Sequence, residues 1–154
     1  MTRARSLPRP ARRVAGLLLH WGREVAAELG AVGPDDPRGR RFGAFGLGSV
    51  LAFPQGTVFN ERYIHLGQDT MVGPYACLTA GMAPEQAMAS DPVVRIGDRC
   101  VIGRGAHVEN SVVMDGARIE EGASVQGSVL GPGTVVGSGQ RVLNAVLGAH
   151  APPS

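Results

Sequence analysis

Residues 108–124, VENSVVMDGARIEEGAS, are followed by residues 125–141, VQGSVLGPGTVVGSGQR, and the second block repeats the first in kind 17 residues later. Val113 corresponds to Leu130, and the pattern continues to Leu147. A repeat unit of this length cannot bury its apolar side alone, so it needs stacked neighbours. The internal repeat therefore predicts a solenoid.

Within each repeat the branched aliphatic residues stand five or six places apart, which predicts three short strands in each turn of a triangular tube. Thirteen positions follow this spacing, and all are Leu, Ile or Val: Leu66, Val72, Leu78, Ile96, Ile102, Val108, Val113, Ile119, Val125, Leu130, Val136, Val142 and Leu147. We expect them to point inward and form the core. The fold class predicted is all-β, a parallel β-helix of about six turns.

A second interior position is expected four residues after each aliphatic one, where the side chains are mostly small. The set is Thr70, Ala76, Cys100, Ala106, Val112, Ala117, Ala123, Val129, Thr134, Val146 and Ala151, with Met82 and Gln140 as exceptions. Glycines that follow the aliphatic residue, as in Ile96-Gly97 and Ile102-Gly103, fit tight corners. A flexible glycine-rich linker is the alternative interpretation, but linkers do not keep an aliphatic residue at fixed places.

The aliphatic-glycine units Leu66-Gly67, Val72-Gly73, Ile96-Gly97 and Ile102-Gly103 resemble the hexapeptide repeats of left-handed β-helix proteins. The left-handed crossover is implied by this resemblance alone, since parallel strands are usually connected with the right hand. Residues 42–107 resemble bacterial hexapeptide-repeat acyltransferases, which move an acyl group from coenzyme A. Residues 108–148 are more similar to the β-helix appended to sugar nucleotidyltransferases, which implies assembly or regulation.

Three segments are expected: a basic tail with an N-terminal capping helix at 1–41, the β-helix at 42–148 and a disordered tail at 149–154. Apolar residues from Val14 to Leu29 have helical spacing, and Gly30 marks the end of that helix. A secretory signal or a membrane-surface helix are alternatives for this stretch. The apolar run from Val14 to Leu19 is short, so cytoplasm is the default localisation and no membrane contact is expected.

All fifteen basic residues are arginine, which excludes a P-loop, a Schiff-base lysine and a Ser-x-x-Lys nucleophile. Nine arginines against four acids lie in residues 1–41, so the net charge of +2 belongs to the tail. The solenoid is slightly acidic with few aromatics, which argues against nucleic-acid binding. The two cysteines form no disulfide framework: Cys100 falls in an interior position, and Cys77 is expected to face outward.

Residues 81–95 break the rhythm and are expected to form a loop thrown out from one corner. Insertions in repeat proteins gather on one face and often line a binding site, although a passive loop is equally compatible with the sequence.

Acyl transfer to a hydroxyl needs a base that works near neutral pH, and histidine is the natural choice. His107 is the first candidate and His65 the second, because each stands directly before an interior aliphatic residue. A solvated or packing histidine is the alternative for both. The acyltransferase resemblance implies that Arg104 and Arg99 contact the phosphates of coenzyme A. The Asn-His loop motif typical of such enzymes is missing after His107.

A zinc site of the γ-carbonic anhydrase kind would need three convergent ligands. His65, His107 and His150 stand 42 and 43 residues apart, which fits neither 17 nor 18 residues per turn, so no metal is expected. The leading prediction is an acyltransferase that uses acetyl-CoA or another acyl-CoA as co-substrate and a sugar or small-molecule hydroxyl as acceptor. The resemblance implies a homotrimer with the donor between subunits. The second prediction is a non-catalytic assembly or regulatory module.

Overall fold

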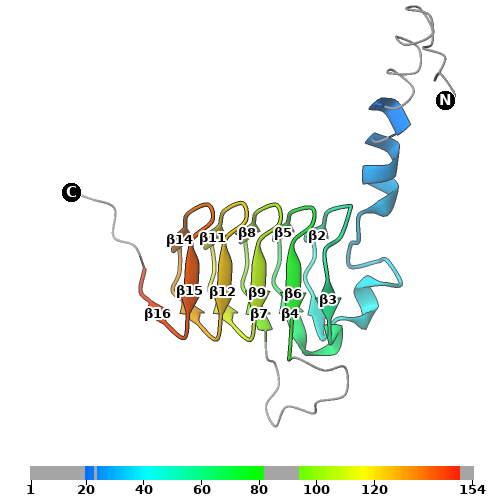
Figure 1. Cartoon of the computed structure of the whole chain (residues 1–154). Helices are drawn as coiled ribbons and strands as arrows, with labels where there is room; N and C mark the ends of the chain where they lie inside the picture. The colour runs from blue at the N-terminus through cyan, green and yellow to red at the C-terminus, as the bar shows by residue number, and fades with distance from the viewer. Residues whose placement is uncertain (1–19, 23, 82–93, 150–154) are drawn as a thin grey trace, which may run out of the picture.

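Three parallel sheets form the walls of a β-solenoid in the computed structural model, which describes residues 20–22, 24–81 and 94–149 (Figure 1). Sheet A contains β2, β5, β8, β11 and β14; sheet B contains β1, β4, β7, β10, β13 and β16; sheet C contains β3, β6, β9, β12 and β15. The sixteen strands make five full turns and one further strand, close to the predicted six turns. The predicted fold class is confirmed.

The strands are two or three residues long. Their bounds are β1 Ala44–Phe45, β2 Val50–Leu51, β3 Val58–Phe59, β4 Ile64–Leu66, β5 Met71–Val72, β6 Cys77–Thr79, β7 Val94–Ile96, β8 Val101–Ile102, β9 His107–Glu109, β10 Val112–Val113, β11 Arg118–Ile119, β12 Ser124–Gln126, β13 Val129–Leu130, β14 Val135–Val136, β15 Arg141–Leu143 and β16 Val146–Leu147. Two 3-10 turns, η1 (Gly39–Arg41) and η2 (Glu61–Tyr63), lie near the N-terminal end.

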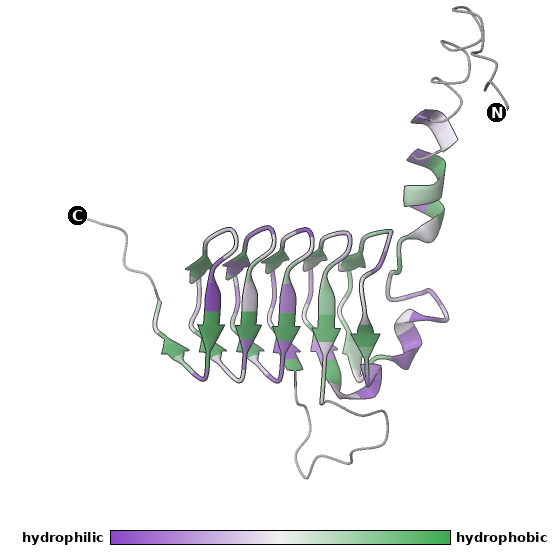
Figure 2. Ribbon diagram, viewed as in Figure 1, coloured by the Kyte–Doolittle hydropathy of each residue, from purple (hydrophilic) through white to green (hydrophobic). Residues whose placement is uncertain are grey.

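The register of the sheets confirms the 17-residue period. Val113 pairs with Leu130, and Leu130 pairs with Leu147. Eleven of the thirteen predicted core positions are buried, and only Val142 and Leu147, in the last turn, are partly exposed. Figure 2 shows the apolar strands and the more polar corners that follow from this alternation.

The second interior position was predicted correctly on two sides of the triangle and wrongly on the third. Thr70, Cys100 and Ala117 are buried as expected, but Val146 is 79% exposed, and Val112 and Val129 also face outward. The side that ends at sheet B takes five residues instead of six, so four places after the aliphatic residue falls on the outer face. Ser111 and Ser128 occupy the interior there instead, at 1% and 2% exposure.

The chain outside the solenoid is helical at residues 20–22 and 24–30, within the predicted helix. Trp21 and Leu29 on this helix are 66% and 79% exposed, and the helix projects from the first turn rather than lying across it (Figure 1). The first turn is contacted by Val32, which is 2% exposed and pairs with Leu51. The capping role stays a prediction, because residues 11–19 lie outside the described residues.

The predicted loop at 81–95 is shorter at its second end, because Val94 and Arg95 belong to β7. Residues 82–93 lie outside the described residues, as do residues 150–154 of the predicted C-terminal tail. The insertion changes the register from 17 to 30 residues without breaking the sheet, since Leu66 pairs with Ile96 and Leu78 with Val108.

Candidate functional site

The outward side chains of each sheet form rows that cross the strands, because in-register neighbours of a parallel sheet lie about 4.8 Å apart. On sheet C one row contains Cys77, His107, Ser124 and Arg141. The next row contains Thr79, Glu109, Gln126 and Leu143. Sheet C therefore has a mostly polar outer surface, and the first candidate base lies within it.

His107 stands beside a carboxylate. Its Nε2 lies 3.4 Å from Glu109 Oε2, and the two side chains are 34% and 18% exposed. Residues i and i+2 of a strand point to the same side, so β9 itself brings the pair together. When Nε2 donates its proton toward Glu109, Nδ1 holds the lone pair that can accept a proton from a substrate.

Arg104 lies three residues before His107, at the corner that joins β8 to β9. Its guanidinium carbon is 5.3 Å from the centroid of the Tyr75 ring, which belongs to the corresponding corner of the preceding turn. Both residues line a hollow of about 340 Å³, together with Phe53, Pro54, Pro74, Ala26 and Ala27. This hollow lies between the N-terminal helix and the corners that join sheet A to sheet C.

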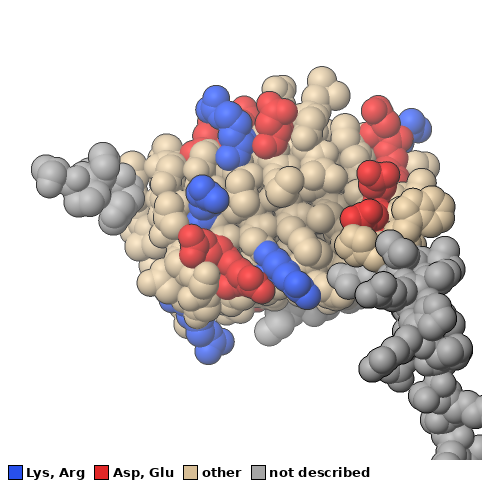
Figure 3. All heavy atoms as spheres, turned by 90° about the horizontal axis from the view of Figure 1, so that it is seen from above, with Lys and Arg blue, Asp and Glu red and all other residues tan. Residues whose placement is uncertain are grey.

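Arg99 does not join this group. It lies at the corner between β7 and β8, with a positive φ of 53°, whereas Arg104 follows β8 at its other end. The two predicted phosphate ligands thus occupy different corners of the triangle. Figure 3, which views the molecule from above, shows acidic and basic side chains near one another and no continuous basic patch on that face.

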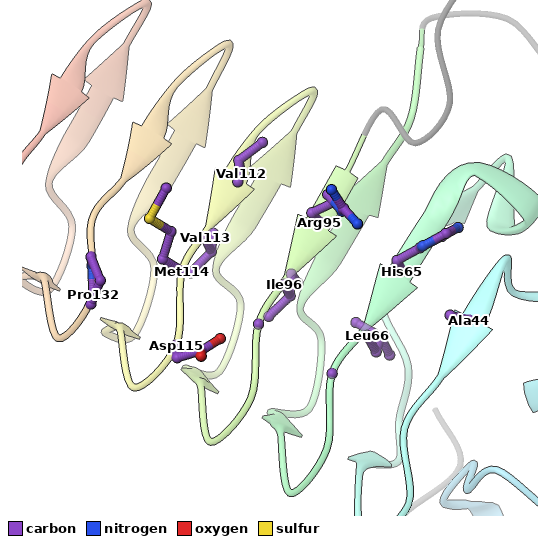
Figure 4. Close-up of a pocket in the computed structure, with 12 residues that line it drawn as sticks. Ala44, His65, Leu66, Arg95, Ile96, Val112, Val113, Met114, Asp115 and Pro132 are labelled. Carbon is purple, nitrogen blue, oxygen red and sulfur yellow. The ribbon is translucent and has the colours of Figure 1, made fainter.

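His65, the second candidate base, lies on a different wall from His107. It faces outward from sheet B, in register with Ala44 and Arg95, and its row continues through Val112 (Figure 4). These residues line an open hollow of about 530 Å³ that extends to Asp115. The ring of His65 lies over Gly43, where an added Cβ would be 2.6 Å from Nε2, so the absence of a side chain at Gly43 sets its position.

The cysteines lie as predicted. Cys100 is fully buried, and its Sγ donates to Met114 O at 3.2 Å. Burial raises the pKa of the Cys100 thiol, because a thiolate there would lose its water. Cys77 is partly exposed on sheet C, next to His107 in register.

No group of three metal-binding side chains occurs among the described residues. His150, the third histidine of the rejected zinc arrangement, lies outside them. His20 is on the helix, with Nε2 3.2 Å from Glu24 Oε1. The helical residues that the structure describes form no segment long and apolar enough to cross a bilayer.

Two features of this site were missed by the sequence analysis. Glu109 was not assigned as the partner of His107, although the alternation of a strand was sufficient to find it. Tyr75 carried no signal, because its contact with Arg104 joins two turns that are separated by the 82–93 insertion.

Comparison with known proteins supports both halves of the predicted resemblance. The family model of the GMPPB C-terminal domain matches residues 55–152, which is more than half of the chain. Among solved structures, a hexapeptide-repeat acetyltransferase of Vibrio cholerae O1 biovar eltor, crystallised with acetyl coenzyme A, superposes with a TM-score of 0.56 at 17% identity. The superposition covers 71% of this chain and 64% of the acetyltransferase chain, and it supports the fold. No curated protein matches the sequence.

Proposed function

This chain belongs to the GMPPB C-terminal domain family, and from its geometry we propose that it transfers an acyl group from acyl-coenzyme A to a hydroxyl of a sugar or another small molecule. The observation that carries the proposal is the 3.4 Å separation of His107 Nε2 and Glu109 Oε2 on an otherwise open polar face. A base that is oriented by a carboxylate is what acyl transfer to a hydroxyl requires.

In the proposed reaction the acceptor hydroxyl loses its proton to Nδ1 of His107 while its oxygen attacks the thioester carbonyl. The carbon–sulfur bond then breaks, and the coenzyme A thiolate takes the same proton from the imidazolium. Glu109 holds the ring and stabilises the positive charge that develops on it. Protons and electron pairs balance without a metal or an oxidant.

The test follows coenzyme A release from acetyl-coenzyme A in the presence of a panel of free sugars, with the full-length chain. We expect acceptor-dependent thiol release, and His107→Gln should lower kcat about 100-fold or more. His20→Gln is a matched control, because His20 also pairs with a glutamate but lies on the exposed helix. Thiol release that is equal in both variants would exclude His107 as the base.

A second function is favoured by the surfaces of sheets A and B. The outward row of sheet A contains Val50, Met71, Val101, Arg118 and Val135, and that of sheet B contains Val112, Val129 and Val146. Met71 is 54% exposed and Val135 is 50% exposed. Two mostly apolar walls beside one polar wall fit an assembly module whose sheets A and B contact other copies.

A threefold arrangement of triangular tubes would bury one corner and its two adjacent walls in every copy. We propose a homotrimer with the corner between sheets A and B at its axis. In this assembly the Arg104 corner of one copy lies opposite the insertion-bearing corner of the next. Failure of acetyl-coenzyme A to bind at millimolar concentration would leave assembly as the function.

A further inference from the structure

The hollow beside Arg104 combines aromatic rings with a positive charge. Tyr75 is 50% exposed and Phe53 is 40% exposed, although both rings line the hollow and could have been buried by a larger neighbour than Ala26 or Ala27. Exposed aromatic rings that share a concave surface are typical of ligand sites. The rings therefore leave room for a planar group.

The charge at this site is not neutralised within the described residues. None of the ion pairs formed among residues 20–22, 24–81 and 94–149 involves Arg104, and its guanidinium lies over the Tyr75 ring instead. Stacking on an aromatic ring orients a guanidinium while its N–H groups remain able to bind an anion. No acidic side chain lines the hollow to compete for it.

The walls are fixed by backbone contacts. Gly30 lies against Phe53, where an added Cβ would be 2.4 Å from Cδ2, and Gln55 Nε2 donates to Gly30 O at 2.6 Å. The Tyr75 N–H donates to Pro54 O at 2.7 Å. These contacts hold the end of the helix and the two corners together, so the hollow is formed before any ligand binds.

We propose that this hollow binds a nucleotide, with the base against the rings of Tyr75 and Phe53 and a phosphate at Arg104. Aromatic stacking accepts any base, and a guanidinium binds phosphate oxygens in a bidentate manner. The chemistry shared by all candidates is a nucleoside diphosphate. Its source is either coenzyme A, in which case the inference rests on the proposed acyl transfer, or a free or sugar-linked nucleotide, in which case it does not.

The experiment measures binding to the full-length chain by calorimetry with four probes: ADP, GDP, coenzyme A and pantetheine, which lacks the nucleotide. We expect saturable binding of the three nucleotide probes and none of pantetheine. Tighter binding of coenzyme A than of ADP and GDP identifies coenzyme A as the source, whereas equal or tighter binding of ADP or GDP identifies a free nucleotide.

The variants separate the two contacts. Arg104→Gln removes the charge, and Tyr75→Asn removes the ring while keeping a residue that tolerates the φ of 59° at this position. Each should weaken ADP binding at least about fivefold. Arg118→Gln, which removes an exposed charge from sheet A, should leave it unchanged.

Equal affinity of all three variants and the unmodified chain for ADP would overturn the proposal, as would pantetheine binding as tightly as coenzyme A or the absence of any nucleotide binding at millimolar concentration. The outcome is distinguishable from that of the proposed function. ADP binding that depends on Arg104, in a chain that releases no thiol from acetyl-coenzyme A, would retain the nucleotide site and reject the transferase.

Discussion

Thr70 Oγ1 accepts a hydrogen bond from the Cys100 N–H at 3.2 Å and donates one to Gly97 O at 2.7 Å, which ties two turns of the solenoid together across the insertion. Ser49 Oγ has the same role in the preceding turn, where it accepts from the Thr70 N–H at 2.9 Å. The small polar residues of the interior thus satisfy backbone groups that the corners leave without a strand partner.

Thr70→Val should lower the free energy of unfolding by about 1–3 kcal/mol, because the Cys100 N–H and Gly97 O lose their buried partner while the side-chain volume is kept. Thr79→Val, on the outer face of β6, is the control and should change stability much less. Urea denaturation of both variants measures the difference. Equal stability of the two would show that the hydroxyl of Thr70 contributes nothing.

Gly46→Ala should destabilise the first turn, because the added Cβ would lie 2.2 Å from Gly67 O and 2.3 Å from Gly67 C, both backbone atoms of the next turn. We expect a loss of about 1–3 kcal/mol from overpacking. Gly33→Ala is the matched control, since an added Cβ there meets nothing within 4 Å. Thermal unfolding that shifts equally in both variants would contradict the close approach of these turns.

The Cys100 thiol should make stability depend on alkaline pH. Its pKa is raised by burial above the ordinary value of 9.0, so the unfolded chain ionises first as the pH rises. The stability contribution is complete below about pH 9 and falls by up to about 1.4 kcal/mol per pH unit until the folded thiol also ionises.

Denaturation between about pH 7.5 and 10.5 tests this dependence by difference, since the range spans the ordinary thiol pKa. Cys100→Ala should flatten the slope, and Cys77→Ala, which alters a partly exposed thiol, should keep it. A slope that persists in Cys100→Ala would assign the pH dependence to other groups.

Glu109→Gln should lower kcat for thiol release about tenfold and leave KM nearly unchanged, because the carboxylate orients His107 and stabilises its charged form without contacting the acceptor. Steady-state kinetics at fixed acceptor concentration separates the two constants. A rise in KM with constant kcat would mean that Glu109 binds substrate.

Val129→Glu should disrupt the proposed homotrimer, since it places a charge in the apolar row of sheet B. Ser124→Glu makes the same change on the polar wall, in the neighbouring strand of the chain, and should not alter assembly. Light scattering gives the mass of each variant, and circular dichroism shows that both are folded. A monomer in the unmodified chain, or a trimer in Val129→Glu, would reject the interface on sheets A and B.

Most of the fold was accessible from sequence, while the site was accessible only to a limited extent. Leu130 could be placed in the core because its equivalents Val113 and Leu147 recur 17 residues away. The five-residue side of the triangle was misinterpreted, so Val129 was placed inside when Ser128 occupies that position. Charge and polarity did not reveal this, because valine suits either face of a strand.

The sequence by itself determined the tube, its core and the two candidate bases, since a repeat fixes which residues point inward through contacts between equivalent positions. The folded chain decided which outward residues meet: His107 with Glu109 on sheet C, Arg104 with Tyr75 at a corner, and His65 with Arg95 on another wall. Outward side chains carry no periodic burial signal. Their neighbours depend on the register across the 82–93 insertion and on the approach of the N-terminal helix, which only the three-dimensional arrangement fixes.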